Sequence, residues 1–362
     1  MMKLEQNSLG MASTVLPSRD RGGLAQPLLS VRGLHKHFII QKSGFGQQAK
    51  RVHAVDGVDF DVMKGETLGI VGESGCGKST TARLLMRLLT PDSGELVFDG
   101  DTVGARGGIS LREMRRQVQM VFQNSYASLN PRMSIEDSIA FGPEVHGLKR
   151  TEARKRARKL LDQVGLAPNL YANRYPHELS GGQRQRVNIA RALALEPRLM
   201  ILDEAVSALD KSVEAQVLNL LVDLKQEYGL TYLFISHDLN VVRYISDRVM
   251  VMYLGKVAEM GDTEALYEAP AHPYTKALIS AMPSMDPNQR TSKAPLAGDP
   301  PNPIDLPQGC RFSPRCPVAI DACHIEEPPL APCGEKHSTA CLRAEAVMHD
   351  RAQVIATNQE LS

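Results

Sequence analysis

The sequence predicts an α/β fold, in which helices cover both faces of a mainly parallel sheet, followed by a smaller C-terminal unit. Two patterns predict the fold. Short apolar runs alternate with helical segments through residues 199–235, and a glycine-rich loop separates an apolar run from a helical pattern within residues 68–89. The 362 residues exceed the usual size of one domain, which favours the additional unit.

The N-terminal part is expected to be a leader followed by two strands. Residues 1–27 mix charged residues with Ser, Pro and Gly and show no apolar signal segment, so we interpret them as a disordered leader. Residues 28–38 and 55–62 alternate apolar and polar side chains, as half-buried strands do. The polar, glycine-containing stretch 41–50 between them is expected to be a loop.

The next segments predict strand, loop and helix, followed by a helical insertion. Residues 68–71 form a short apolar run, and residues 80–89 have helical spacing. Residues from about 124 to 180 contain few strand signals and an amphipathic helical stretch, which indicates a helical subdomain. The basic residues of that stretch are interpreted as a solvated face, because Leu160, Leu161 and Val164 define an apolar one.

From residue 180 the α/β pattern resumes, with strands at 199–202 and 231–235, helices at 180 onward and 213–227, and a hairpin over 249–260 that turns near Gly255. Pro becomes frequent after about residue 262. We therefore predict a main domain over 28–262, a C-terminal extension over 263–345 and a tail over 346–362.

Composition and charge exclude two classes of protein. Lys and Arg total 42 and Asp and Glu 41, so the net charge of +1 gives no basic surface for nucleic acid. No apolar run approaches the roughly 20 residues that span a bilayer. We expect a cytoplasmic protein without a nucleic-acid partner, whose membrane association runs through another protein.

The sequence GESGCGKS at residues 72–79, here called the phosphate loop, predicts a nucleotide phosphate site. Glycines allow backbone N–H groups to turn toward phosphate oxygens, and the following helix directs its positive end at them. Lys78 would reach the β and γ phosphates, and Ser79 would offer a hydroxyl to magnesium. The predicted nucleotide-binding residues here are Gly72, Glu73, Ser74, Gly75, Cys76, Gly77, Lys78, Ser79 and Thr80.

Cys76 lies inside this loop, where nearby N–H dipoles could lower the pKa of its thiol and favour alkylation. The simpler interpretation is a small, tolerated side chain without a catalytic role. We favour that interpretation.

The run RLMILDE at residues 198–204 places two carboxylates directly after a buried apolar strand. Asp203 is the candidate that holds magnesium, and Glu204 the candidate that acts on the attacking water. An acidic pair after a strand is common on protein surfaces, so the assignment depends on its order after the phosphate loop.

The sequence LSGGQRQR at residues 179–186, here called the signature segment, resembles the signature of the ATP-binding subunits of ABC transporters. The resemblance covers nearly all of residues 28–345 and implies a P-loop NTPase fold of the ABC nucleotide-binding type. It also implies a sandwich dimer with two ATP molecules at its interface. Ser180, Gly181, Gly182 and Gln183 would bind the γ-phosphate of ATP held by the opposite subunit, through a capped helix N-terminus.

Other positions match the same family one by one. The resemblance implies that Phe38 stacks on adenine, that Gln123 contacts magnesium and the attacking water, and that His237 orients the γ-phosphate. Residues 207–210, ending in Asp210, match the loop that crosses the dimer. Magnesium would thus be held by Ser79, Gln123 and Asp203, with Glu204 as the general base. Ala205-Val206 stands where the family commonly has Pro-Thr. This difference is expected to change the stiffness of the loop rather than catalysis.

Two further segments, SYASLNPRMSI after Gln123 and HPYTKAL at residues 272–278, resemble the oligopeptide/dipeptide importer subfamily, and most closely its second ATPase subunit. The subfamily also includes nickel and glutathione importers. It implies a second ATPase subunit, identical or different, two transmembrane permease subunits contacted through residues 124–135, and an extracytoplasmic solute-binding protein. The chain would then be peripheral at the cytoplasmic face of the membrane.

Five of the six cysteines lie in the last part of the chain. Five residues separate Cys310 from Cys316, six separate Cys316 from Cys323, and seventeen separate Cys323 from Cys341. The spacing resembles the cysteine motif of the same subfamily, for which a four-iron four-sulfur cluster is implied in some members. Zinc and free or oxidisable thiols stay open as alternatives, and Cys333 is the expected spare.

The sequence therefore predicts an ATPase that energises uptake of di- and oligopeptides, with Glu204, His237, Gln123 and Lys78 as catalytic residues. One alternative is the same machine importing nickel, glutathione or another small solute. A non-transport ABC ATPase is a second, but such proteins usually carry tandem ATPase units, coiled coils or basic linkers. A subunit with a decayed ATP site is a third, and the presence of all the key residues argues against it.

Overall fold

The structure is a computed structural model that describes residue 23 and residues 25–40, 50–282 and 302–348. Most of the predicted leader 1–27, of the predicted loop 41–50 and of the predicted tail 346–362 lies outside these residues. No helix within the described part of the chain combines the length and the apolar character needed to cross a membrane.

The larger sheet has eight strands in the order β11-β12-β10-β9-β3-β8-β7-β6. Five neighbouring strands of it are parallel: β9 (Arg248–Tyr253), β3 (Thr67–Val71), β8 (Thr231–Ile235), β7 (Leu199–Asp203) and β6 (Val118–Val121). Every residue of β3, β7 and β8 is buried, as expected where both faces of a parallel sheet are covered. The predicted mainly parallel sheet is confirmed.

The other edge of this sheet is antiparallel and includes strands of the C-terminal extension. β10 (Lys256–Asp262) forms the predicted hairpin with β9 and pairs on its other side with β12 (His337–Thr339). β11 (Ala331–Gly334) completes the edge. The sheet therefore continues through the predicted boundary near residue 262, and the boundary itself stays a prediction.

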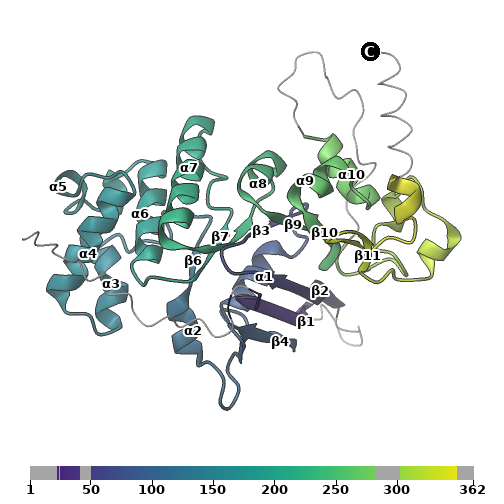
Figure 1. Ribbon diagram of the computed structural model, residues 1–362, viewed down its shortest axis with the longest axis horizontal. Helices are drawn as coiled ribbons and strands as arrows, with labels where there is room; N and C mark the ends of the chain where they lie inside the picture. The colour runs from purple at the N-terminus through teal and green to yellow at the C-terminus, as the bar shows by residue number, and fades with distance from the viewer. Residues whose placement is uncertain (1–22, 24, 41–49, 283–301, 349–362) are drawn as a thin grey trace, which may run out of the picture.

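A second, four-stranded antiparallel sheet has the order β2-β1-β4-β5. β1 (Leu29–Ile40) and β2 (Lys50–Val62) correspond to the two predicted N-terminal strands. β4 (Ser93–Phe98) and β5 (Asp101–Thr102) were not predicted, and the first three residues of β4 are exposed, which hides the alternating pattern. The two sheets enclose helix α1 (Lys78–Leu85) and part of the core (Figure 1).

The parallel strands divide the core into two clusters because successive side chains point to opposite faces. On β7, Leu199 and Ile201 join the cluster shared with the antiparallel sheet. Met200 and Leu202 join the other cluster, which contains the helices of the opposite side. Both faces of the sheet are thus packed, and only the ends of its strands remain available for chemistry.

The helical subdomain lies at one end of the molecule, far from β11 (Figure 1). It contains α3 (Ile135–Val145), α4 (Arg150–Gln163), α5 (Pro168–Tyr171), the short turn η1 (Pro176–Glu178) and α6 (Gly181–Leu193). Leu160, Leu161 and Val164 are buried, and Arg154 and Arg158 on α4 pair with acidic residues of α3. The apolar face of the basic helix is confirmed, and the division that makes 124–180 a separate helical subdomain stays a prediction.

The other helices in the described part of the chain are α2 (Leu111–Gln117), α7 (Lys211–Tyr228), α8 (Leu239–Ile245), α9 (Thr263–Glu268) and α10 (Pro273–Ser280), with short turns η2 (Ser313–Arg315) and η3 (Asp321–His324).

The start of α10 is formed by His272, Pro273 and Tyr274, the first three residues of the HPYTKAL segment. His272 caps the helix by accepting from the Tyr274 amide at 3.0 Å, and Pro273 occupies the first turn, where its missing N–H has no cost. Burial lowers the pKa of His272 to about 4, so the imidazole is neutral.

Glu259 on β10 joins three parts of the C-terminal half. Its carboxylate is fully buried and accepts from the Ala271 amide at 2.7 Å and from the His272 amide at 2.9 Å. It also lies 2.7 Å from Nε2 of His337 on β12. One buried carboxylate therefore fixes the start of α10 and the edge strand relative to the core sheet.

Replacing Glu259 with Ala should destabilise the protein by about 3 kcal/mol, because buried donors lose their acceptor and a buried ion pair loses one partner. Thermal unfolding checks this, with the exposed Glu268→Ala on α9 as the matched control. Equal melting temperatures for the two variants would contradict the role given to Glu259.

Candidate functional site

The phosphate loop follows β3 and has the backbone that its glycines allow. Gly72, Gly75 and Gly77 have φ values of 147°, 80° and 111°, in the region that side chains disfavour. A Cβ on Gly72 would lie 2.2 Å from the Met252 carbonyl oxygen, and one on Gly77 would lie 2.2 Å from that of Ala54. The loop therefore packs against β9 and β2 too closely for any other residue at these two positions.

Lys78 and Ser79 begin α1 and point back over the loop. The Lys78 side chain is buried, and Nζ donates to the carbonyl oxygens of Gly72 at 2.7 Å and Glu73 at 3.0 Å. Ser79 Oγ donates to Asp203 Oδ1 at 2.8 Å. Burial raises the pKa of Asp203, and the Ser79 hydrogen bond opposes this effect. The hydroxyl and carboxylate offer the hard oxygen ligands that magnesium prefers.

Glu204 lies at the centre of the predicted catalytic group. Its φ of 49° is rare for a residue with a side chain, and its amide donates to the Ile235 carbonyl at the end of β8 at 2.9 Å. Gln123 Nε2 donates to Glu204 Oε2 at 2.7 Å, and His237 Nδ1 lies 3.6 Å from the same oxygen. The structure thus brings together three predicted residues that follow three neighbouring strands, β6, β7 and β8.

Cys76 is 3% exposed and lies between the loop backbone and Lys78. Burial raises the pKa of its thiol, and the nearby Lys78 ammonium only partly opposes this. An activated thiol is therefore not favoured. The structure supports the simpler interpretation of a small packed side chain.

Phe38 lies near the end of β1, opposite Val52 on β2. Its side chain is 38% exposed, with Lys36 Nζ 5.7 Å from the ring centroid. Two residues further along β2, the Ala54 carbonyl contacts the phosphate loop at Gly77. Phe38 is thus a partly exposed aromatic residue on the strand that pairs with β2, and its stacking on adenine stays a prediction.

The signature segment is a well-formed helix start that lies apart from the phosphate loop. Ser180 Oγ accepts from the Gln183 amide at 3.3 Å, and Gln183 Oε1 accepts from the Ser180 amide at 3.0 Å, which is a capping box. α6 packs with α3 and α4 (Figure 1). Within the described residues, no hydrogen bond or ion pair joins residues 180–183 to residues 72–80, and Asp210 at the N-terminus of α7 is exposed.

Two residues of the C-terminal extension hold the phosphate loop and were not predicted to. The Arg315 guanidinium donates to both carboxylate oxygens of Glu73, at 2.9 and 3.1 Å. The Tyr274 hydroxyl accepts from the Glu73 amide at 2.8 Å. The Arg315 side chain is 5% exposed, and its hydrogen bonds to Glu73 raise its pKa further. A carboxylate inside a loop that binds anions needs a cation nearby to balance its charge. The presence of Glu73 in the phosphate loop was therefore the feature of the sequence that pointed to a partner such as Arg315.

The four predicted cysteines Cys310, Cys316, Cys323 and Cys341 line one small apolar pocket, whereas Cys333 lies beside a different one. Burial raises the pKa of Cys341 to about 11, and the neighbouring thiols raise it further. Burial also raises the pKa of Cys310 and Cys316, again with contributions from other cysteines of the group. The structure brings these four sulfurs together.

Comparisons with known proteins identify relatives of this chain. Residues 55–207 match the ABC transporter family, and residues 258–323 match the oligopeptide/dipeptide transporter C-terminal region. The chain is 50% identical over 325 residues to a probable peptide ABC transporter ATP-binding protein of Sinorhizobium fredii, covering 89% of this chain and 92% of that protein. It is 47% identical over 321 residues to the di/tripeptide transport ATP-binding protein DppF of Pseudomonas aeruginosa, covering 88% and 98%.

Two solved structures share the fold. The cbiO1 protein of Clostridium perfringens, part of an ABC transporter complex, has a TM-score of 0.57 at 30% identity and covers 67% of this chain and 90% of its own. The ATP-binding cassette MJ0796, a dimer bound to ADP and phosphate after hydrolysis, has a TM-score of 0.55 at 29% identity and covers 65% and 98%.

Replacing Glu204 with Gln should leave ATP binding intact and lower the hydrolysis rate by roughly 10²- to 10⁴-fold, because the amide cannot accept the proton of the attacking water. Steady-state phosphate release and nucleotide binding, measured on the same preparation, check this. Wild-type turnover in the variant would reject Glu204 as the base.

Replacing Arg315 with Ala should weaken ATP binding by roughly tenfold or more, because the partly buried Glu73 carboxylate loses its bidentate partner within the phosphate loop. Titration with a fluorescent ATP analogue checks this, with the exposed Arg112→Ala on α2 as control. Equal affinities in the two variants would show that the extension does not support the phosphate loop.

Proposed function

The chain belongs to the ATP-binding proteins of ABC transporters and carries the C-terminal region of oligopeptide/dipeptide transporters, and from this premise we propose that it hydrolyses ATP to energise peptide import. One observation supports this proposal more strongly than any other. Residues from four segments of the chain meet at one edge of the sheet: Ser79 donates to Asp203, and Gln123 and His237 both lie beside the carboxylate of the next residue, Glu204.

Each residue has a role that its position supports. The loop amides and Lys78 would hold the phosphates of ATP and stabilise the charge that develops during phosphoryl transfer. Ser79, Asp203 and Gln123 would hold magnesium, which neutralises phosphate charge when bound. Glu204 would accept the proton of the attacking water, while Gln123 and His237, both beside its carboxylate, would orient that water and the γ-phosphate.

A single chain supplies only part of each ATP site. Its signature segment lies on the helical subdomain and is not joined to its own phosphate loop by any hydrogen bond or ion pair of the described residues. The free N–H groups at the start of α6 suit an anion. We propose that they bind the γ-phosphate held by a second ATPase subunit, identical or different, with Asp210 at the same interface.

Residues 124–135 would transmit the ATP-driven closure of the two ATPase subunits to the membrane permease. Asn188 on α6 donates to the Ser125 carbonyl at 3.1 Å, and Arg191 on α6 donates to the Ser128 carbonyl. The segment begins next to Gln123 at the ATP site, and its Tyr126 is 54% exposed. It therefore links the phosphate site, the signature helix and an open surface that we assign to the permease subunits at the cytoplasmic face.

Peptides are the proposed cargo because the similar proteins named above are peptide transport proteins and because the C-terminal region matches along residues 258–323. An extracytoplasmic binding protein would deliver the peptide. The same machine importing nickel, glutathione or another small solute is the second candidate, since nothing in this chain touches the cargo.

We propose that Cys310, Cys316, Cys323 and Cys341, which line one apolar pocket, hold a four-iron four-sulfur cluster. The cluster would supply a redox-active centre and cross-link the extension. Zinc is the alternative, and its bonds of about 2.3 Å to sulfur would place tetrahedral ligands roughly 3.8 Å apart. Among the described residues, no three of the cysteine sulfurs all lie within 4.8 Å of one another, which favours the cluster over zinc.

Cells that lack this protein should lose uptake of labelled di- and oligopeptides, and wild type but not Glu204→Gln should restore it. The transport assay checks both cargo and catalytic site. Unchanged peptide uptake in the deletion strain, with reduced uptake of nickel or glutathione, would contradict the peptide assignment and leave the ATPase assignment intact.

Protein purified without oxygen should contain about four irons per chain if the cluster forms. Cys323→Ser should lose the iron, whereas Cys333→Ser, outside the pocket, should retain it. Elemental analysis that finds neither iron nor zinc in the wild type would exclude both metal assignments.

A further inference from the structure

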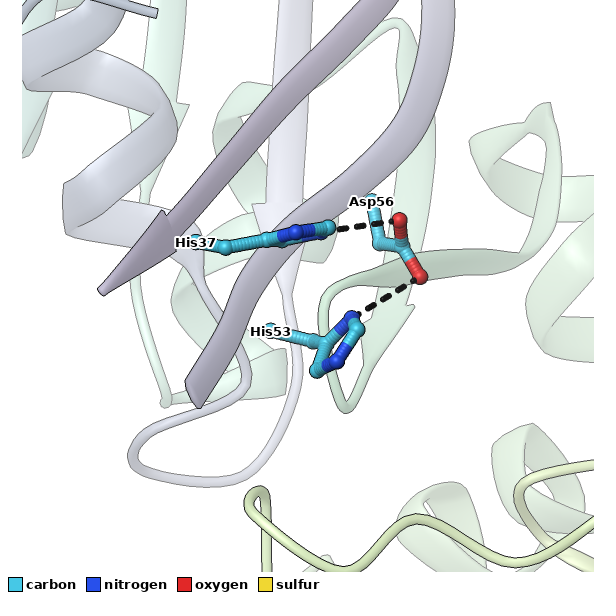
Figure 2. A group of neighbouring side chains, drawn as sticks. All are labelled: His37, His53 and Asp56. Carbon is cyan, nitrogen blue, oxygen red and sulfur yellow. Dashed lines mark hydrogen bonds and ion pairs between the residues drawn. The ribbon is translucent and has the colours of Figure 1, made fainter. Parts of the chain in front are cut away.

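A second group of metal-binding side chains lies on the antiparallel sheet, outside the phosphate site and the cysteine pocket. Asp56 on β2 is surrounded by three imidazoles (Figure 2 shows two of them). His37 Nε2 lies 3.1 Å from Asp56 Oδ1, and His53 Nδ1 lies 3.6 Å from Asp56 Oδ2. His35 Nε2 lies 3.6 Å from Oδ1.

Strand pairing builds this group. In the register of β1 and β2, His35 lies opposite Asp56 and His37 lies opposite His53. The pairing shifts between Lys36 and His37. Side chains alternate along a strand, so two residues three apart normally face opposite sides. The shift removes this difference and lets His53 and Asp56 share one face with His37.

The distances suit one small cation. One ligand atom each from His37, His53 and Asp56 lies within 4.8 Å of the others. Nitrogen and oxygen ligands about 2.0 to 2.2 Å from a tetrahedral zinc ion are roughly 3.3 to 3.6 Å apart. The two His–Asp distances, 3.1 Å from His37 Nε2 to Oδ1 and 3.6 Å from His53 Nδ1 to Oδ2, are close to this range. The two imidazoles and one carboxylate would leave a fourth position open.

One imidazole nitrogen of this group has no hydrogen-bond partner. His53 Nδ1 is buried, and the charged Asp56 Oδ2 lies 3.6 Å from it, which is beyond hydrogen-bond distance. His35 is held in place by Nδ1, which lies 2.8 Å from the Gly33 carbonyl oxygen, and its Nε2 lies 3.6 Å from Asp56 Oδ1.

Arg311 fixes the carboxylate from the other side. Its guanidinium donates to Asp56 Oδ2 and to the Leu254 carbonyl. Burial raises the pKa of Asp56, but the hydrogen bond and charge of Arg311 outweigh it and bring the value to about 2. Oδ1 faces His35 and His37, whereas Oδ2 lies beside His53 and accepts from Arg311. The simpler alternative is that Arg311 alone satisfies Asp56 and that no metal binds.

We propose that His37, His53 and Asp56 form a binding site for a divalent transition metal of the zinc class, with His35 beside it. Imidazole ligands favour such ions over magnesium or calcium. His37, His53 and Asp56 are 22%, 30% and 17% exposed, so the ion can enter from solvent. The site is separate from the proposed ATP hydrolysis and does not depend on it.

The position of the site gives the metal a structural effect. It would join the end of β1 to β2 directly beside Phe38, the predicted adenine-stacking residue. Through Arg311 it would also be connected to the C-terminal extension. A bound ion should therefore stabilise the hairpin and hold Phe38 in place.

Cobalt titration of the metal-depleted full chain, without nucleotide and with excess magnesium, tests the proposal. Wild type should bind one ion with the visible d–d absorption of nitrogen and oxygen ligands, and zinc should displace it. Thiolate charge-transfer bands in the near ultraviolet report any cobalt at the cysteines separately. The visible absorption reports cobalt bound at the proposed site. His37→Ala and His53→Ala should each weaken this cobalt binding by roughly 10- to 100-fold or more, whereas the exposed His146→Ala on the helical subdomain should leave it unchanged.

Far-ultraviolet circular dichroism and thermal unfolding without metal show whether each variant is folded, and if His37→Ala fails this control, His53→Ala and His53→Gln decide. Absence of the visible band in the wild type, or a cobalt affinity in the His53 variants equal to that of the wild type, would overturn the metal site. Arg311 alone would then satisfy the Asp56 carboxylate. Either result leaves the ATPase assignment untouched, because phosphate release with magnesium is measured independently.

Discussion

The packing of the five parallel strands, buried on both faces, is the constraint on which the rest of the structure depends. Only strand ends are free, so the phosphate loop, Asp203 with Glu204, Gln123 and His237 all emerge at one edge. The Glu204 amide bound to the Ile235 carbonyl continues the sheet by one hydrogen bond beyond β7. That bond holds Glu204 in its unusual backbone conformation and aims its carboxylate at Gln123 and His237.

The C-terminal extension is part of the support for this edge. It adds strands to the core sheet, and Tyr274 and Arg315 reach Glu73 from α10 and η2. The short turn between Cys310 and Cys316 also carries Arg311, which holds Asp56. Two arginines from one cysteine-flanked turn thus contact the phosphate loop and the base of the hairpin that carries Phe38. We infer that order in the cysteine pocket and order around the nucleotide are physically linked.

The sequence predicted the chemistry of the site well for a simple reason. An apolar run followed by a polar residue marks the end of a buried strand, and the ends of parallel strands meet. Asp203 and Glu204 were selected in this way before any coordinates were considered. Gln123, His237 and Phe38 were assigned from the family resemblance, and strand-end reasoning explains why Gln123 and His237 lie beside Glu204.

Contacts between distant segments could not be predicted in this way. Glu73 and Arg315 are 242 positions apart, and no local pattern pairs them. The grouping of His53 with His37 and Asp56 depends on a shift in strand pairing, and strand alternation alone would have separated them. β4 was missed because its first three residues are exposed and break the alternation, and β5 because two residues are too few to show one.

The central claim is that one chain holds ATP but needs the signature segment of a second chain to complete the site. Light scattering on Glu204→Gln, alone and mixed with the second ATPase subunit of its transporter, tests this most directly. The account predicts a dimer with ATP and magnesium that separates with ADP. A particle that stays monomeric in every mixture, together with wild-type turnover per chain that does not change with concentration, would contradict it.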